Sequence, residues 1–123
     1  MENQKIKDFT DLIAWQESHR LVLAIYNSTS SFPNEEIYSL TSQLRRAGVS
    51  VTSNIAEGFS RYSIKEKIQF YYMALGSVTE LESQLILAND LKYLDQKNFQ
   101  DTVILIIRVS KLINGLIRSL KSA

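Results

Sequence analysis

A single proline, Pro33, and four glycines are the only strong helix breakers in this chain of 123 residues. Folds built from many short strands need frequent turns, and turns draw heavily on proline and glycine. No stretch alternates apolar and polar residues for long enough to predict a strand. Instead, apolar residues recur every three or four positions through four long segments. The sequence therefore predicts an all-α fold.

The four predicted helices cover residues of about 10–28, 35–58, 64–90 and 96–120. Helices of roughly 20 to 27 residues are about 30 to 40 Å long, and short connections favour antiparallel neighbours. A chain of this length buries one core, so we expect a single domain over residues 1–123. The expected architecture is an antiparallel up-down-up-down four-helix bundle.

Residues typical of helix ends mark several of these boundaries. Asn34 is the expected N-terminal cap of the second helix, and Gly58 suits a left-handed residue at its C-terminal end. Ser63 followed by Glu66 predicts a capping box for the third helix. Asp95 is the expected cap of the fourth.

Three glycines fall inside the predicted helices, where each costs about 1 kcal/mol relative to alanine. Gly48 lies in the core-facing stripe, where the missing side chain lets another helix approach closely. Gly76 and Gly115 lie off their stripes. Close contact with a neighbouring subunit is one explanation for them, and chance is the other.

The last two helices carry more apolar surface than one bundle needs. A core-facing stripe is a little wider than about 100°, whereas the apolar residues of 96–120 cover well over half the circumference. Phe70, Tyr71 and Tyr72 are consecutive, so they point in three directions and cannot all enter one core. A second apolar face buried between copies of the chain predicts a homo-oligomer. The alternative is a broad core with some aromatic residues left exposed.

Residues suited to catalysis are scarce. The absence of cysteine excludes disulfides, thiolate metal sites and cysteine nucleophiles. The only histidine, His19, is expected on the inner face of the first helix, with Trp15, Leu23 and Tyr26, in a structural role. There is no repeated Glu-x-x-His pair, phosphate-binding glycine loop or nucleophile elbow. We expect no enzymatic activity, no metal and no cofactor.

Five polar residues close to the apolar stripes form what we call the polar cluster: Arg45, Arg46, Asn54, Glu57 and Glu82. Glu82 falls within the apolar arc of its helix, where a carboxylate needs a partner, and Arg45 is the expected one. Removing Glu82 would then cost about 3 to 5 kcal/mol by leaving Arg45 buried and unpaired. Asn54 is expected to hydrogen-bond to a neighbouring helix. Arg46 and Glu57 face away from the core and are either solvated or part of a polar contact between subunits.

Residues 102–123 contain four cations and no acid. Arg108, Lys111, Arg118 and Lys121, which we call the basic ridge, lie on one side of the last helix, away from its broad apolar arc. One interpretation is a solvated face that complements the negative end of the helix dipole. The other is a surface that contacts nucleic-acid phosphates. The net charge is only +1, but an oligomer would repeat the ridge in every subunit.

A smaller basic cluster lies near the start of the third helix. It comprises Arg61, Lys65 and Lys67, with one acid among them. The adjacent Tyr71 and Tyr72 suit either stacking on bases or packing in the core. We expect core packing.

Three stretches, "WQESHRLVLAIY", "SQLRRAGVSVTSNIAEG" and "ALGSVTELESQL", resemble a bacterial four-helix-bundle family encoded in intervening sequences of 23S ribosomal RNA genes. This family is similar to the accessory variability protein of diversity-generating retroelements. The resemblance implies a four-helix protomer that assembles into a pentamer. For the retroelement relatives it also implies binding to nucleic acid and to a reverse transcriptase.

Two functional classes remain open at this point. The first is an oligomeric adaptor that binds RNA or DNA through the basic ridge, with a reverse transcriptase or another protein as a further partner. The second is an oligomeric scaffold that binds only protein. The charged N-terminus and the short apolar runs predict a cytoplasmic bacterial protein without a membrane span.

Overall fold

A computed structural model describes residues 5–123, so the first four residues of the predicted domain lie outside the described part. Four α-helices account for most of the chain: α1 Ile13–Thr29, α2 Leu40–Ser60, α3 Ile64–Asp90 and α4 Gln96–Lys121. Two short 3₁₀ helices, η1 Phe9–Asp11 and η2 Asn34–Glu36, precede α1 and α2. No strand occurs in residues 5–123, and the prediction of an all-α fold with four helices is confirmed.

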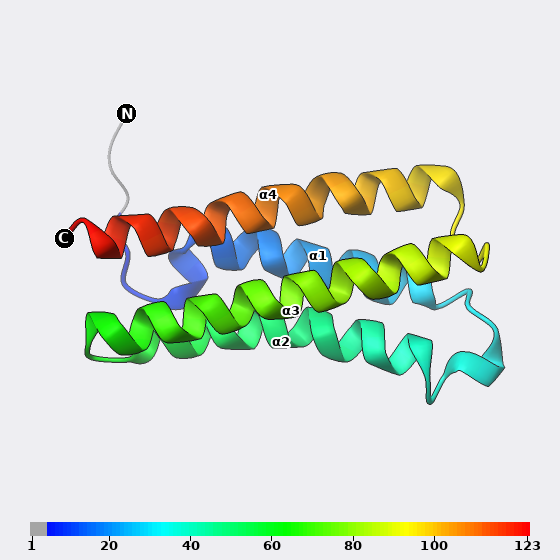
Figure 1. Ribbon diagram of the computed structural model, residues 1–123, viewed down its shortest axis with the longest axis horizontal. Helices are drawn as coiled ribbons and strands as arrows, with labels where there is room; N and C mark the ends of the chain where they lie inside the picture. Colours follow the sequence, from blue (N-terminus) through cyan, green and yellow to red (C-terminus); the bar gives the residue numbers. More distant parts are fainter. Residues whose placement is uncertain (1–4) are drawn as a thin grey trace.

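The helices lie side by side, each packed against its neighbours in chain order, and α4 returns to pack against α1 (Figure 1). The contact between α2 and α3 is the most extensive of these. Each helix runs back along the one before it, so α1 begins and α4 ends on the same side of the molecule (Figure 1). None of the helices in residues 5–123 is both long enough and apolar enough to cross a membrane.

The first two helices begin later than predicted. Asp8 accepts a hydrogen bond from the Phe9 amide at 2.7 Å and so caps η1, and α1 begins at Ile13. The prediction that Asn34 caps an α-helix is wrong, because the chain forms only the 3₁₀ helix η2 there. Non-helical dihedrals at Ser39 separate η2 from α2. The carboxylate of Glu36 then accepts from the Leu40 amide at 3.3 Å.

The caps of α3 and α4 are those predicted. Ser63 Oγ accepts a hydrogen bond from the Glu66 amide at 3.1 Å, and Asp95 Oδ1 accepts from the Asn98 amide at 2.7 Å. The capping box at Ser63 is incomplete. The Glu66 carboxylate accepts from the Ser63 hydroxyl at 3.0 Å instead of from its backbone amide.

Gly58 does not provide the predicted left-handed cap. No glycine in residues 5–123 has a positive φ, and α2 continues to Ser60. The left-handed residue is Lys92, with φ 65°, just after α3. Amides there bond back to the carbonyls of Ala88 and Asn89, which is a Schellman motif. Gly58 instead permits the close approach of α2 and α3, since a Cβ at this position would lie 2.7 Å from Cε1 of Tyr71.

The other helical glycines are less crowded. A Cβ at Gly48 would lie 3.7 Å from Val22 Cγ2, which is ordinary van der Waals contact, so α1 is close but leaves room for a methyl group. Nothing described lies within 4 Å of the corresponding point at Gly76. At Gly115 the nearest atom is a guanidinium nitrogen of Arg118 at 4.0 Å.

One continuous core lies between the four helices. Its fully buried large side chains are Leu21, Ile25, Leu44, Val51, Ile55, Leu81, Leu85, Ile106, Val109 and Ile113. The four helices contribute to one cluster of buried side chains. Packing of these amphipathic faces supplies most of the helical stability, as is usual in bundles.

The prediction of the inner face of α1 is wrong, because the buried side of the helix is rotated about the helix axis from the predicted side. His19, Leu23 and Tyr26 are exposed, and His19 stacks on Trp15 with ring centroids 4.8 Å apart. The buried face instead carries small and polar residues, including Ala14, Glu17 and Ser18, beside Leu21 and Ile25. Small and polar side chains thus occupy part of the core face of α1, whereas Leu23 and Tyr26 lie outside it.

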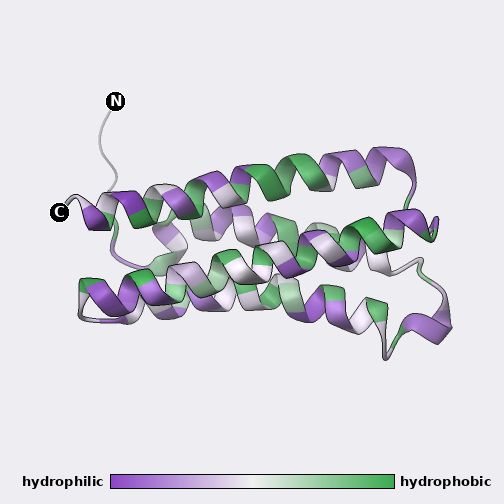
Figure 2. Cartoon of the chain, viewed as in Figure 1, coloured by the Kyte–Doolittle hydropathy of each residue, from purple (hydrophilic) through white to green (hydrophobic). Residues whose placement is uncertain are grey.

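Some of the surplus apolar surface remains accessible. Figure 2 shows a hydrophobic stretch along the middle of α4. There, Ile104 and Ile107 keep 66% and 47% of their surface exposed. Of the three consecutive aromatic residues of α3, only Tyr71 is buried. Burial of these surfaces between subunits stays a prediction.

Candidate functional site

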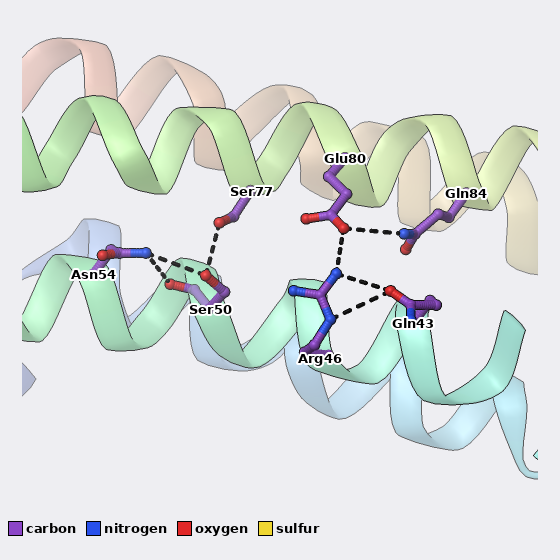
Figure 3. A network of polar contacts seen from close by, with 7 residues as sticks. All are labelled: Gln43, Arg46, Ser50, Asn54, Ser77, Glu80 and Gln84. Atoms are coloured by element: carbon purple, nitrogen blue, oxygen red, sulfur yellow. Dashed lines mark hydrogen bonds and ion pairs between the residues drawn. The ribbon is translucent and has the colours of Figure 1, made fainter. Parts of the chain in front are cut away.

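Polar side chains join α2 to α3 along one edge of the bundle (Figure 3). Arg46 forms an ion pair with Glu80, and its guanidinium also donates to Gln43 Oε1 at 2.9 Å. Gln84 donates to the same Glu80 oxygen at 3.3 Å. Both charged partners are substantially exposed, so the pair contributes at most about 1 kcal/mol.

The same edge continues through hydroxyl groups. Ser50 Oγ and Ser77 Oγ lie 2.8 Å apart across the two helices (Figure 3). Asn54 was expected to bond across to another helix, but its amide donates to Ser50 O at 2.9 Å and Ser50 Oγ at 3.2 Å, within α2. Asn54 therefore positions the Ser50 hydroxyl, which makes the crossing contact.

Arg45 and Glu82 do not form the predicted ion pair. Arg45 faces α1, where its Nε donates to Thr29 Oγ1 at 2.9 Å and its guanidinium lies over the Tyr26 ring. Glu82 is only half-buried, and no residue of 5–123 forms a hydrogen bond or ion pair with it. The sequence predicts Glu82 within the apolar arc of its helix, but in the structure Glu82 lies at the margin of that arc.

Glu57 also has a simpler role than predicted. It pairs with Arg61 four residues later at 2.8 Å, and both side chains are largely exposed. Apart from Glu82, the polar cluster thus divides into three separate sets of contacts. One joins α2 to α3, one joins Arg45 to α1, and one closes the C-terminal end of α2.

Replacement of Glu82 by alanine is expected to change the free energy of unfolding by less than about 0.5 kcal/mol, because no described partner is lost. Urea denaturation measures this directly. The adjacent Leu81→Ala is the control, since Leu81 is fully buried and its truncation costs about 2 to 5 kcal/mol. A loss of 3 kcal/mol or more in Glu82→Ala would restore the original prediction.

The basic ridge turns diagonally across α4. At one end, Arg108 Nε donates to Glu17 Oε1 of α1 at 2.5 Å. At the other end, Lys121 Nζ donates to the Tyr72 hydroxyl of α3 at 2.8 Å. Between them, Lys111 and Arg118 are exposed and bond to no other side chain of residues 5–123.

Two residues of α1 outside the predicted site, Glu17 and Arg20, lie beside Arg108 of the basic ridge. Glu17 is buried in the groove between α1 and α4, and its carboxylate accepts from Arg20 at 2.9 Å as well as from Arg108. The bond from Arg20, followed by that from Arg108, holds the pKa of Glu17 below its ordinary value. One carboxylate between two guanidinium groups leaves a net positive charge. The only signal in the sequence was the three-residue spacing of Glu17 and Arg20.

The Glu17 ion pairs predict a specific dependence of stability on pH. Because folding lowers its pKa, Glu17 stabilises the protein fully above its unfolded pKa of about 4.3, and this contribution is lost as the pH falls further. Glu17→Gln should therefore be less stable than the parent by about 1 kcal/mol near pH 7, given the exposed arginines. Urea denaturation should show the difference shrinking as the pH falls below about 4.3. A difference that does not change with pH would contradict the ion-pair origin.

Two of the three residues of the smaller basic cluster contact other groups within the chain. Arg61 pairs with Glu57 and lies over the Phe70 ring, while Lys67 donates to the carbonyl of Phe59 at 2.7 Å. Lys65 remains exposed near Tyr72, on the side to which Lys121 reaches. Of the basic ridge, Lys121 contacts α3, at the end of the bundle where α3 begins and α4 ends (Figure 1).

Within 5–123 no three histidine or acidic residues converge as metal ligands would. His19 is exposed on α1 beside Trp15. What the surface does present is a line of cations and a number of apolar side chains, which suit binding to a charged or a protein partner.

Comparison with known proteins gives one family and one fold. The model of the family "23S rRNA-intervening sequence protein" matches residues 10–115. A crystal structure of a protein with unknown function, from the S23 ribosomal protein family of Bacteroides thetaiotaomicron, is similar with a TM-score of 0.76. The identity is 20%, over 85% of this chain and 98% of that one, and a likeness at this level shows the fold. Among curated proteins no relative matches. Because the family match extends over most of the chain, the protein belongs to the 23S rRNA-intervening sequence protein family.

Proposed function

We propose that this protein is a non-enzymatic cytoplasmic adaptor, built as an antiparallel up-down-up-down protomer of a homo-oligomer, that binds RNA or DNA through the basic ridge. The observation that carries the proposal is the pair Lys111 and Arg118, exposed at the centre of a stretch without acids. Such cations attract phosphates whatever the base sequence.

The length of the ridge suits a nucleic-acid backbone. With a rise of 1.5 Å per residue, Arg108 and Lys121 are about 20 Å apart along α4. A strand with one charge per roughly 3.4 Å would place several phosphates over that distance. Arg20 extends the positive surface past Arg108, since Glu17 balances only one of the two guanidinium groups.

Oligomerisation would convert this modest surface into a strong one. The chain carries a net charge of only +1, but a ring of subunits repeats every ridge. Exposed apolar residues on all four helices provide surface for such contacts. The pentamer is the assembly that the resemblance to the retroelement accessory protein implies, and a reverse transcriptase is the partner implied by the same resemblance.

The test is the binding of a fluorescently labelled single-stranded RNA, followed by anisotropy over a series of salt concentrations. We expect log K to fall linearly with log salt, with a slope of about −0.7 for each phosphate contact. Absence of binding even at low salt would overturn the nucleic-acid function. Light scattering on the same sample gives the number of subunits.

A scaffold that binds only protein is the second candidate, and one observation favours it. Ile104 and Ile107 are exposed on α4 next to Arg108 and Lys111. A mixed apolar and basic helix face is typical of protein contacts as well as of solvated surfaces. Stable oligomers that fail to bind RNA or DNA at any salt concentration would support this candidate.

A further inference from the structure

A hollow lies on the surface of α3 close to the end of α4, away from the exposed centre of the basic ridge. Lys65, Ile68, Gln69, Tyr72 and Met73 line it, and its volume is about 620 Å³. All five residues lie on α3, so this is an open hollow along the surface of one helix rather than an enclosed pocket. No carboxylate is among the lining residues.

Tyr72 is the central feature of this hollow. Its side chain keeps 48% of its surface exposed, although it belongs to a helix that packs well elsewhere. The ammonium group of Lys121 lies at the edge of the Tyr72 ring, 2.8 Å from the hydroxyl and 5.3 Å from the ring centroid. An exposed aromatic ring beside a positioned cation is the combination that nucleic-acid-binding surfaces use for stacking.

The other lining residues restrict what the hollow can hold. Ile68 and Met73 provide apolar contacts for a flat ring, and Gln69 offers both an amide donor and an acceptor. Lys65 and Lys121 supply positive charge on α3 and α4. A planar, polar-edged group attached to phosphates fits this chemistry, whereas an acidic peptide would leave the aromatic and apolar surface unused.

We propose that this hollow binds one unpaired nucleobase of a single strand, stacked on Tyr72, while Lys65 and Lys121 contact the adjoining phosphates. This rests on the proposed nucleic-acid function and makes it specific for single strands. In a duplex the base faces are covered by their neighbours, so only an unpaired base can offer a face to Tyr72. The basic ridge would then carry the strand onward across α4.

The experiment compares three labelled probes of equal length: a single-stranded RNA, an abasic strand with the same phosphates, and an RNA duplex. Anisotropy titrations are made with the parent protein, Tyr72→Ala and Tyr72→Phe. We expect Tyr72→Ala to weaken single-strand binding about ten- to a hundredfold, with an unchanged salt slope. Tyr72→Phe should retain most of the affinity, and neither variant should alter binding of the abasic strand.

The control is Tyr38→Ala, because Tyr38 is also exposed, at 96%, but precedes α2, which begins at the end of the bundle opposite to the start of α3 (Figure 1). It should bind like the parent protein. Gln69→Ala, at an exposed lining residue, gives a second test that does not disturb the core, and a several-fold loss confined to the single strand is expected.

Each contrary outcome has a distinct meaning. If the parent protein binds none of the probes at low salt, the proposed function fails and the base site with it. If it binds the abasic strand or the duplex as tightly as the single strand, or if Tyr72→Ala has no effect, only the base site is overturned. The assignment to a strand would also be overturned if a free mononucleotide, at the same concentration as the single strand, displaced the labelled probe equally well.

Discussion

Replacement of Gly58 by alanine is expected to lower the free energy of unfolding by about 1 to 3 kcal/mol, the usual cost of overpacking. A Cβ at this position would lie 2.7 Å from Cε1 and 3.0 Å from Cδ1 of Tyr71, and 3.1 Å from Cβ of Phe70. The Tyr71 ring is buried, and the Cβ of Phe70 moves only with its backbone. The end of α2 would therefore have to move away from α3.

A loss of stability in Gly58→Ala is informative because alanine favours helices more than glycine does. In an unhindered helix interior the same substitution stabilises by about 1 kcal/mol. Gly76→Ala is the matched control, since nothing described lies within 4 Å of the added methyl group. Thermal or urea denaturation should show Gly58→Ala destabilised and Gly76→Ala unchanged or stabilised.

Two other results for these glycine variants would change the interpretation. A Gly58→Ala protein as stable as its parent would mean that α2 and α3 are not as close as described. Destabilisation by Gly76→Ala would point to a neighbouring subunit packed on α3, as one reading of the sequence suggested. The latter effect should depend on protein concentration, because it acts on an assembly.

The helix positions could be predicted because local signals determine them. Ser63 and Asp95 satisfy the orphan amides of their own helices, so α3 and α4 begin at those signals whatever lies nearby. The beginning of α2 was misjudged by five residues. Proline and acidic residues suit the first turn of a 3₁₀ helix as well as that of an α-helix, and only the dihedrals of Ser39 separate the two.

The contacts between helices could not be predicted in the same way. Arg45 and Arg46 are adjacent, and Glu80 and Glu82 differ by two positions, so the sequence allows several pairings. The register of α2 against α3 selects Arg46 with Glu80. The pair of Glu17 and Arg108 depends on α4 packing beside α1, a relation between residues far apart in the chain. Small buried residues such as Ala14 and Ser18 decide the rotation of α1, and a hydrophobicity wheel gives them little weight.

Reversing the two exposed cations of the basic ridge is expected to abolish most of the nucleic-acid binding. The variant is Lys111→Glu with Arg118→Glu, which changes the charge of every subunit by four. Loss of two phosphate contacts should reduce the magnitude of the log K against log salt slope by about 1.4 for single strands. Repulsion from the new carboxylates adds to this, so we expect affinity at low salt to fall at least tenfold.

These two positions are better targets than Arg108, whose reversal would place two acids together and disturb the α1–α4 contact. The matched control is Lys92→Glu with Lys97→Glu, which gives the same change of net charge around the connection from α3 to α4, at the end of the bundle where α4 begins (Figure 1). Both control residues are exposed, and the pair of Lys97 with Asp101 is a surface contact worth little. Equal losses of affinity in the two variants would mean that net charge, not the ridge, governs binding. A loss confined to the ridge variant, with unchanged unfolding in urea, would identify α4 as the surface that contacts phosphates.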